Sequence, residues 1–291
     1  MRTLRQKLNK TELNIVKLIN RGIFYGLKIE IYKIFFDQKY FNSRRKVILL
    51  FVLKLLNKIR NKQAELIFNI MNGSFETNSQ LGQDLFVLQQ LKNKKYGFFI
   101  EVGAGDGKTF SNTFLLEKKF NWDGILVEPN KTLYKKCVKT RECKVVNKLL
   151  LPAHKSSSKF YEMETGEFSY SEGYASLNTG EIKAVYEMPI TNFEDLFQEY
   201  REIPKIDFVS IDTEGSELDI VSSIDFEKYK PTIICIEHNF RRFDRKFLKK
   251  YLKKRGYKLK YEGISRWDSW FVLKGKEISN SIVESAKHEK K

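Results

Sequence analysis

The stretch Phe98-Phe99-Ile100-Glu101-Val102-Gly103-Ala104-Gly105-Asp106-Gly107 decides the fold. Its first five residues predict a buried strand, and three alternating glycines predict a tight turn directly after it. Glycine is needed where a ligand approaches the backbone closely or where the torsion angles exclude a β-carbon. The spacing departs from the dinucleotide fingerprint, whose third glycine comes one residue later. Glu101 would repel a pyrophosphate but attract an ammonium group, which favours a cofactor with an amino-acid end such as S-adenosylmethionine.

Three further apolar runs end in acidic or polar side chains. Glu128 follows Gly124–Val127, and its two oxygens suit a ribose diol. Asp212 and Glu214 follow the second run, and Glu237, His238 and Asn239 end the third. Ligands of open α/β sheets bind beyond the carboxyl ends of the strands. We therefore expect these side chains, together with Glu101, at one edge of the sheet.

Apolar β-rich runs alternate with helical patterns after residue 80, which predicts a doubly wound, mostly parallel α/β sheet. The predicted strands are Phe98–Val102, Ile125–Glu128, Lys144–Leu150, Ile206–Asp212 and Thr232–Glu237. The predicted helices are Thr109–Lys119, Lys131–Thr140, Asn192–Tyr200, Ser216–Ser223 and Arg241–Arg255. Tyr257–Tyr261 and Ser269–Leu273 predict an antiparallel hairpin, with the C-terminal strand at the sheet edge. The polar stretch Pro152–Glu187 is either a functional insertion near the strand ends or a solvated excursion with a small hairpin.

Charge divides the 291-residue chain, whose net charge is +17. Residues 1–72 hold sixteen Lys and Arg against four acids and repeat apolar residues at helical spacing, so we predict a basic helical segment. It packs on the rest of the chain with its charges solvated, lies on an anionic membrane, or holds an anionic glycan or nucleic acid. Residues 73–275 are the predicted catalytic domain and residues 276–291 a polar tail.

Two further observations concern the cellular setting. Three scattered cysteines, Cys137, Cys143 and Cys235, give no disulfide scaffold or paired zinc-ligand spacing. The sequence contains no apolar run long enough to span a bilayer. No apolar segment or small-residue cleavage site follows the basic residues 1–10, so we do not expect a secretory signal. We expect a cytoplasmic location, with peripheral membrane contact through residues 1–72 as the alternative.

Five short motifs, in this order, resemble the FkbM-type methyltransferases. They are Ser79–Asp84, the Glu101–Gly107 loop with Asn112, Val127–Pro129, Ser210–Glu217 and Ile236–Asn239. The resemblance spans roughly residues 79–273. It implies a class I, Rossmann-like fold and S-adenosylmethionine-dependent methylation of an oxygen, commonly a hydroxyl of a sugar or natural product.

The resemblance also assigns cofactor-binding residues. Glu101, Gly103 and Gly105 would contact the methionine end of the cofactor, Glu128 the ribose, and Asp212 would lie near the sulfonium. Ala104, Asn112 and Asn147 complete these cofactor-binding candidates. Gln80, Gln83 and Asp84, which precede the first strand, either fold over the cofactor carboxylate or cap a helix.

Methyl transfer to an alcohol requires the acceptor to be positioned and deprotonated. His238 is the first candidate base, because histidine accepts a proton near neutral pH, and the alternative is a structural histidine at a strand end. Asp212 and Glu214 are the other catalytic candidates. Asp212, Glu237 and His238 also suit Mg²⁺ or Mn²⁺, with Glu214 or Asn239 completing the shell. His238→Ala and Asp212→Asn are each expected to abolish transfer.

The acceptor is expected to be a carbohydrate or glycan, with candidate contacts at Tyr170, Tyr174, Ser176 and Asn239. A nucleic-acid methyltransferase is the main alternative, but most of the positive charge lies outside the predicted catalytic domain. The acidic Asp212–Gly215 segment would also repel a phosphate, so nucleic acid is not the expected partner. Methylation of another small molecule and a non-catalytic cofactor-binding module stay as further alternatives.

Overall fold

The structure, a computed structural model, describes residues 77–152, 155–166, 168–174, 180–262 and 265–276. These residues belong to the compact unit Asn69–Lys291. The predictions for the basic segment 1–72 and for the tail beyond residue 276 fall outside the described residues and stay predictions. Among the described residues, no helix combines the length and apolar character required to cross a bilayer.

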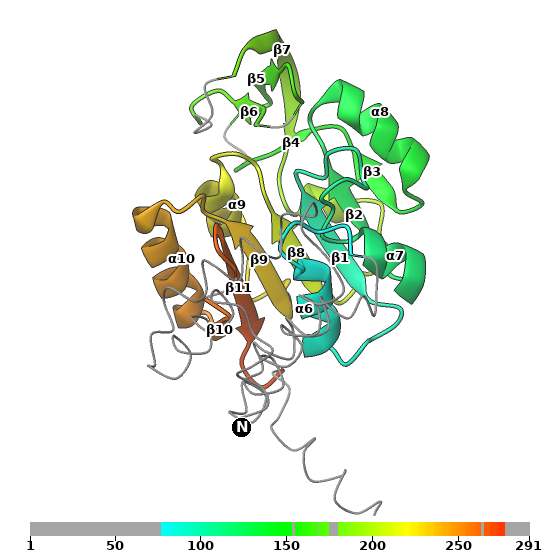
Figure 1. The fold of residues 1–291 in the computed structure, drawn as a ribbon, viewed down its shortest axis with the longest axis vertical. Helices are drawn as coiled ribbons and strands as arrows, with labels where there is room; N and C mark the ends of the chain where they lie inside the picture. Colours follow the sequence, from blue (N-terminus) through cyan, green and yellow to red (C-terminus); the bar gives the residue numbers. More distant parts are fainter. Residues whose placement is uncertain (1–76, 153–154, 167, 175–179, 263–264, 277–291) are drawn as a thin grey trace, which may run out of the picture. The chain divides into compact units, whose positions relative to one another are not determined.

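The main sheet has seven strands in the order β10-β11-β9-β8-β1-β2-β3 (Figure 1). β1, β2, β3, β8 and β9 are parallel, and β11 runs antiparallel to both of its neighbours. The C-terminal strand was expected at the edge, whereas the structure places β11 one position inside, with β10 as the edge strand. The strands are β1 (Phe98–Val102), β2 (Asp123–Val127), β3 (Lys144–Val146), β8 (Phe208–Ile211), β9 (Ile233–Glu237), β10 (Tyr257–Lys260) and β11 (Asp268–Leu273).

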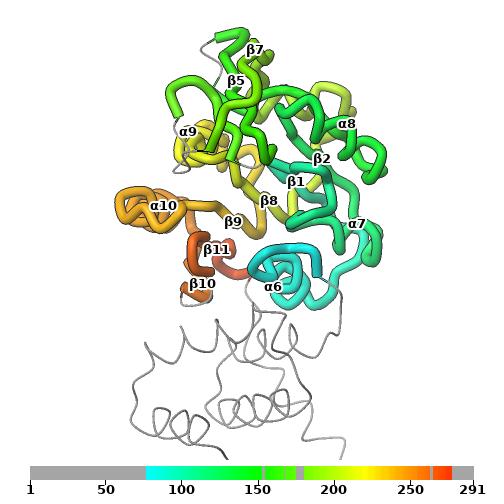
Figure 2. Tube along the Cα trace, turned by 45° about the horizontal axis from the view of Figure 1, so that its top comes forward, coloured from blue at the N-terminus to red at the C-terminus, as the bar shows by residue number. Residues whose placement is uncertain are grey.

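Helices cover both faces of this sheet, as predicted for a doubly wound fold. From β1 the chain proceeds to β2 and β3 in one direction, and β8 and β9 extend the sheet in the other. Right-handed crossovers therefore place α7 and α8 on one side and α9 and α10 on the opposite side (Figure 2). The helices are α6 (Gln83–Gln90), α7 (Phe114–Phe120), α8 (Lys131–Thr140), α9 (Glu217–Ser223) and α10 (Arg242–Lys254). The topological switch lies between β1 and β8, where ligands of such folds bind.

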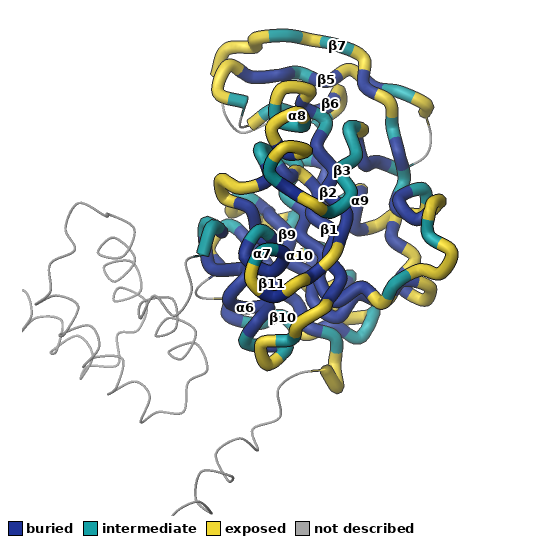
Figure 3. Tube along the Cα trace, turned by 90° about the vertical axis from the view of Figure 1, so that its right-hand side faces the viewer, coloured by how far each residue is buried: buried dark blue, intermediate teal, exposed yellow. Residues whose placement is uncertain are grey.

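Burial on both faces explains the apolar strands. Every residue of β1, β8 and β9 is buried, whereas five of the ten residues of β7 (Ile182–Thr191), which belongs to a second sheet, are exposed (Figure 3). The helix α6 packs on this sheet through Phe86, whose ring stacks on that of Trp270 in β11 with centroids 4.9 Å apart. That contact fixes α6 against the C-terminal half of the sheet.

The polar insertion and the residues that flank it form a second sheet of four strands in the order β4-β7-β5-β6. These strands are β4 (Leu149–Leu150), β5 (Ser157–Met163), β6 (Tyr170–Ser171) and β7 (Ile182–Thr191). The predicted strand Lys144–Leu150 is therefore wrong as a single element, since it divides into β3 and β4, which belong to different sheets. The Asn147 side chain accounts for the break, because it turns back to donate to the carbonyls of Glu128 and Pro129.

The helix predicted over Asn192–Tyr200 is also wrong. Only a 3₁₀ turn, η2 (Asp195–Phe197), forms there. Phe193 and Phe197 both pack their rings against Tyr229, at centroid distances of 4.9 and 5.3 Å. The aromatic packing therefore decides the conformation of this segment in place of helical propensity.

Candidate active site

A cavity of about 540 Å³ lies at the carboxyl ends of β1, β2, β8 and β9. The glycine loop after β1, the acids after β2, β8 and β9, and residues of the insertion line it. The insertion thus covers the predicted ligand-binding edge, which favours the functional interpretation of this segment. Its lining residues include Glu101, Gly103, Gly105, Asn112, Glu128, Tyr170, Asp212, Glu214, Glu237, Asn239 and Trp267.

The glycine loop is fixed by a close backbone approach. Gly103 has a φ of +83°, and a β-carbon built on it would lie 1.7 Å from the carbonyl oxygen of Asp212. Gly105 also has a positive φ, +59°, but nothing lies within 4 Å of its added β-carbon. Gly103 is therefore required for β1 and β8 to meet, whereas Gly105 leaves open space beside the loop.

Glu128 connects the glycine loop to the end of β2. One carboxylate oxygen accepts from the backbone nitrogen of Gly105 at 2.7 Å, and the other accepts from Asn130 at 2.7 Å. Burial, opposed by these hydrogen bonds and reinforced by the charge of Glu101, raises the pKa of Glu128 to about 7. Each oxygen retains a lone pair for a further donor, as the predicted ribose contact requires.

Glu101 is engaged with the chain itself. Its carboxylate accepts from the Ser111 and Thr113 hydroxyls at 2.9 and 2.6 Å and from the Asn112 backbone nitrogen at 2.6 Å. Glu101 lines the cavity, but it also holds the segment that leads into α7. The predicted contact with the methionine end of the cofactor therefore stays a prediction beside this structural role.

A buried arginine, which the sequence analysis did not single out, lies behind the glycine loop. The Arg141 guanidinium donates to the Gly107 carbonyl at 3.1 Å and the Thr113 hydroxyl at 2.9 Å, and it forms an ion pair with Glu117. Glu101 lies 3.7 Å from it. No sequence motif points to this residue, because it is 34 positions away from Gly107 along the chain.

One buried polar atom in the cavity wall has no partner. The Asn112 amide nitrogen donates to the Ser210 hydroxyl at 2.9 Å, but its side-chain oxygen has no hydrogen bond in the structure. A buried acceptor without a partner is costly, and a ligand donor would relieve that cost. With Glu128 placed for the ribose, this oxygen fits the ammonium group of S-adenosylmethionine. The residues present therefore suit that cofactor.

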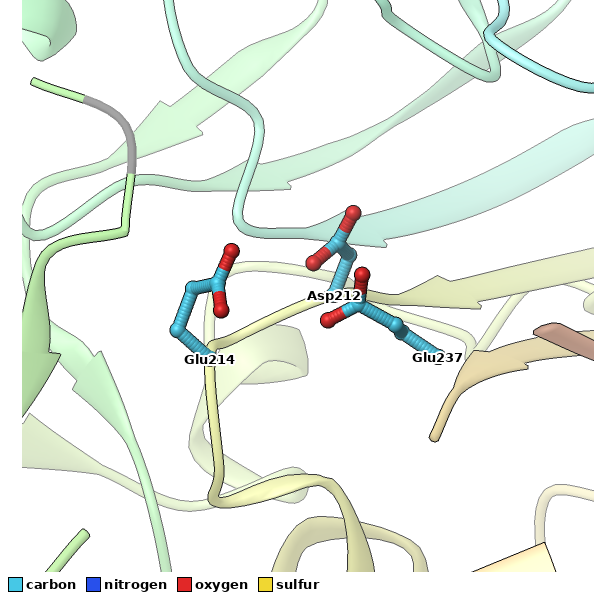
Figure 4. A group of neighbouring side chains, drawn as sticks. All are labelled: Asp212, Glu214 and Glu237. Carbon is cyan, nitrogen blue, oxygen red and sulfur yellow. The ribbon is translucent and has the colours of Figure 1, made fainter. Parts of the chain in front are cut away.

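Three carboxylates meet on the floor of the cavity. Asp212, Glu214 and Glu237 each offer an oxygen, and these oxygens lie within 4.8 Å of one another (Figure 4). Burial and the charge of Glu214 raise the pKa of Asp212 well above its usual value, and burial and the charge of Asp212 raise the pKa of Glu237. Asn239 donates to Glu237 at 2.7 Å and to Glu214 at 3.4 Å.

His238 has a different environment from these acids. It is 1% exposed and is not among the residues that line the cavity. Its Nδ1 accepts from the backbone nitrogen of Phe240 at 3.1 Å, and its Nε2 is buried without a partner. Burial, followed by the charge of Arg245, lowers the pKa of His238. The three side chains that could hold a cation are therefore Asp212, Glu214 and Glu237, without the predicted His238. The position of His238 favours the alternative of a structural histidine.

Three predicted cofactor contacts point elsewhere. Asp84 accepts from the hydroxyls of Thr77 and Ser79 at 2.7 Å, and Gln83 donates to Asp268 at 2.7 Å. Neither they nor Asn147 line the cavity, whereas Gln80 does. Asp84 therefore holds the segment that precedes α6, and no side chain caps the start of this helix. Ala104 lines the cavity, and its contact with the cofactor stays a prediction.

The predicted acceptor contacts are separated by the fold. Tyr170 lines the cavity and stacks on Tyr161 with ring centroids 4.9 Å apart. Tyr174 does not line it and donates to Asp219 at 2.5 Å. Ser176 lies outside the described residues. Trp267, which the sequence analysis did not single out, also lines the cavity. Its backbone carbonyl accepts from the Asn239 backbone nitrogen at 3.1 Å.

A comparison with protein families matches residues 101–259 to the methyltransferase FkbM domain. The chain belongs to the FkbM methyltransferase family. The family confirms the resemblance found in the motifs and implies S-adenosylmethionine as cofactor. No curated protein matches the chain.

Solved methyltransferase structures are also similar to this FkbM chain. The FkbM methyltransferase from Methylobacillus flagellatus KT is 14% identical, with a TM-score of 0.38, and the match covers 60% of this chain and 43% of that one. M. capricolum TrmK, in complex with S-adenosylhomocysteine, is 11% identical with a TM-score of 0.33, covering 64% of this chain and 66% of that one. The N-terminal domain of human METTL16 is 16% identical with a TM-score of 0.36, covering 64% and 66%.

Proposed function

We propose that this protein is an S-adenosylmethionine-dependent O-methyltransferase that acts on a hydroxyl of a sugar or glycan. The convergence of Asp212, Glu214 and Glu237 beside the cofactor loop carries this proposal. When bound, S-adenosylmethionine supplies an electrophilic methyl group with a good leaving group. The task of the protein is therefore to position a hydroxyl and to take up its proton.

The carboxylate cluster is placed for that proton. Asp212 follows β8 directly, and its carbonyl touches the glycine loop, so its side chain lies at the junction of the cofactor site and the acidic floor. A carboxylate there either accepts the hydroxyl proton or holds a divalent cation that acidifies the hydroxyl. We favour Mg²⁺ or Mn²⁺, because three oxygen ligands in close proximity suit hard cations and a cation would relieve their mutual repulsion.

Polar and aromatic groups beside the cluster favour a sugar. Tyr170, Ser171 and Asn239 line the cavity, and all three carry hydrogen-bonding groups. Trp267 supplies a second aromatic surface at the same cavity. Carbohydrates bind through such combinations of ring contact and hydrogen bonding, since a pyranose has an apolar face and a polar rim.

Transfer of labelled methyl from S-adenosylmethionine to a panel of glycans and oligonucleotides tests the proposal. We expect alkali-stable label on a glycan, loss of transfer with EDTA, and recovery with Mg²⁺ or Mn²⁺. Unchanged transfer in EDTA would leave the carboxylates as metal-free bases and would reject the cation. Label on a nucleobase, or none on any acceptor despite cofactor binding, would reject the O-methyltransferase assignment.

A further inference from the structure

The solvent face of α10 is strongly basic. The helix contains seven basic residues and one acidic residue in thirteen positions. Leu248 and Leu252 bury one side of it, and the opposite side carries a stripe at helical spacing. We call this stripe the α10 face; it comprises Arg242, Phe243, Lys246, Lys250 and Lys253, all of them exposed.

Two phenylalanines project from the end of α10 nearest the cavity. Phe243 is 74% exposed and Phe240, just before the helix, is 63% exposed. Phe240 has a φ of +59°, a strained conformation for a bulky residue, and its ring meets that of Trp267 at 6.2 Å. Trp267 and Asn239 line the cavity. The exposed aromatic pair therefore lies at the rim of the active site.

The cations behind this pair are not neutralised within the described part of the chain. Asp244 pairs with Arg241, and Glu262 pairs with Arg245 and Lys249. Arg242, Lys246, Lys250 and Lys253 form no ion pair with any described residue. The face thus combines free positive charge with apolar rings at one end.

We propose that the α10 face docks the protein on an anionic lipid surface, with Phe240 and Phe243 entering the interface. Basic residues attract anionic headgroups, and exposed aromatic side chains bury their rings at the acyl boundary. The docking goes beyond the proposed function and does not depend on which hydroxyl is methylated. It brings the cavity rim to the bilayer, where a lipid-linked acceptor would be presented.

The geometry favours lipid over nucleic acid. Single-stranded nucleic acid is held in basic grooves that track the backbone between stacking rings. Here the cations lie along the convex side of a helix, and the nearest cavity has Asp212, Glu214 and Glu237 on its floor, which would repel phosphates. Phenylalanine, without a polar group, also suits an apolar interface.

Co-sedimentation of the full chain with vesicles tests this proposal. Vesicles of phosphatidylcholine with and without phosphatidylglycerol are compared at low and high salt, using wild type, Lys246→Gln/Lys250→Gln and Phe243→Ser. Each lysine near the surface contributes about fivefold to partitioning, so the double variant is expected to lose about 25-fold on anionic vesicles. Phe243→Ser is expected to lose the salt-resistant part of binding.

Matched variants separate this surface from the charge of the whole chain. Lys135→Gln/Lys139→Gln changes the same charge on exposed positions of α8, and Tyr96→Ser removes an aromatic side chain that is also 74% exposed. Both controls are expected to bind like wild type. Equal losses in the controls, no vesicle binding at all, or a loss of oligonucleotide binding in place of vesicle binding would overturn the proposal. Calorimetry with S-adenosylhomocysteine, unchanged in every variant, shows separately that the cofactor site is intact.

Discussion

The carbonyl oxygen of Asp212 occupies the position at which Gly103 would carry a β-carbon, 1.7 Å from the atom that would be added. This contact joins the end of β8 to the cofactor loop after β1. It therefore sets the distance between the predicted cofactor site and the acidic cluster, and small changes at Gly103 must displace one or the other.

Gly103→Ala is expected to abolish binding of S-adenosylhomocysteine and to destabilise the fold severely. The obstacle is backbone, which cannot move aside as a flexible side chain would. Gly105→Ala provides the comparison, since its φ is also positive but its β-carbon meets nothing. It should cost only about 1–2 kcal/mol in the free energy of unfolding. Urea denaturation of both variants checks this, and equal losses would contradict the steric account.

The affinity for S-adenosylhomocysteine is expected to rise with pH through about 7. The raised pKa of Glu128, about 7, means that the carboxylate is largely protonated below that pH, and only the ionised form accepts fully from two ribose hydroxyls. The slope should approach tenfold per pH unit below 7 and flatten above it. Calorimetric titrations between pH 5.5 and 8 measure the slope.

Glu128→Gln is the control for that titration. Asp84 and Asp268, whose pKa values burial raises to about 6, titrate in the same range and are unchanged in this variant. The pH dependence of the affinity should therefore disappear in Glu128→Gln, although Asp84 and Asp268 still titrate. A slope that persists in the variant would assign the titration to one of these other groups.

Asp212→Asn and Glu237→Gln should fold normally, yet each should lose at least about 10²-fold in methyl transfer. Each substitution keeps the shape of the side chain and places a group that cannot ionise beside the other two acids, so the melting temperature should not fall. His238→Gln is expected to retain transfer within about tenfold, because His238 does not line the cavity. Inactivity of His238→Gln with intact cofactor binding would restore the histidine as base.

Arg141→Met should destabilise the protein by about 3–5 kcal/mol, because it removes the buried cation beside Glu117 and Glu101 and leaves Glu117 only the partly exposed Lys118, 3.2 Å away. Arg141→Lys keeps the charge but cannot reach Glu117, Gly107 and Thr113 together, so we expect weaker cofactor binding with a smaller stability loss. Leu252→Ala, in the buried side of α10, serves as a destabilised control. If it weakens cofactor binding equally, Arg141 acts on stability alone.

The centre of the main sheet could be predicted because β1, β8 and β9 are buried on both faces and their sequences are mostly apolar, as in Ile233–Ile236. The position of the cavity could also be predicted, because the glycines and acids follow parallel strands whose carboxyl ends share one edge of the sheet. The outer strand β7 could not be found this way, because its exposed lysine and glutamate residues hide the pattern. Contacts distant in sequence, such as Arg141 with Gly107, leave no local signal.

His238 shows a second limit. Proximity to Glu237 in the sequence suggested that both side chains point into the site. The alternation of a strand, however, no longer applies beyond its last residue, and His238 turns into the packed region near Arg245. Glu214, two residues beyond Asp212 on a loop with a positive φ of 56°, approaches the cluster instead.

A crystal structure with S-adenosylhomocysteine tests the central claim most directly. The account predicts the ribose hydroxyls on Glu128, the amino group at the Asn112 side-chain oxygen, and the sulfur facing Asp212. A ligand bound with its homocysteine end away from Gly103–Gly107, or with its sulfur remote from the three carboxylates, would contradict it.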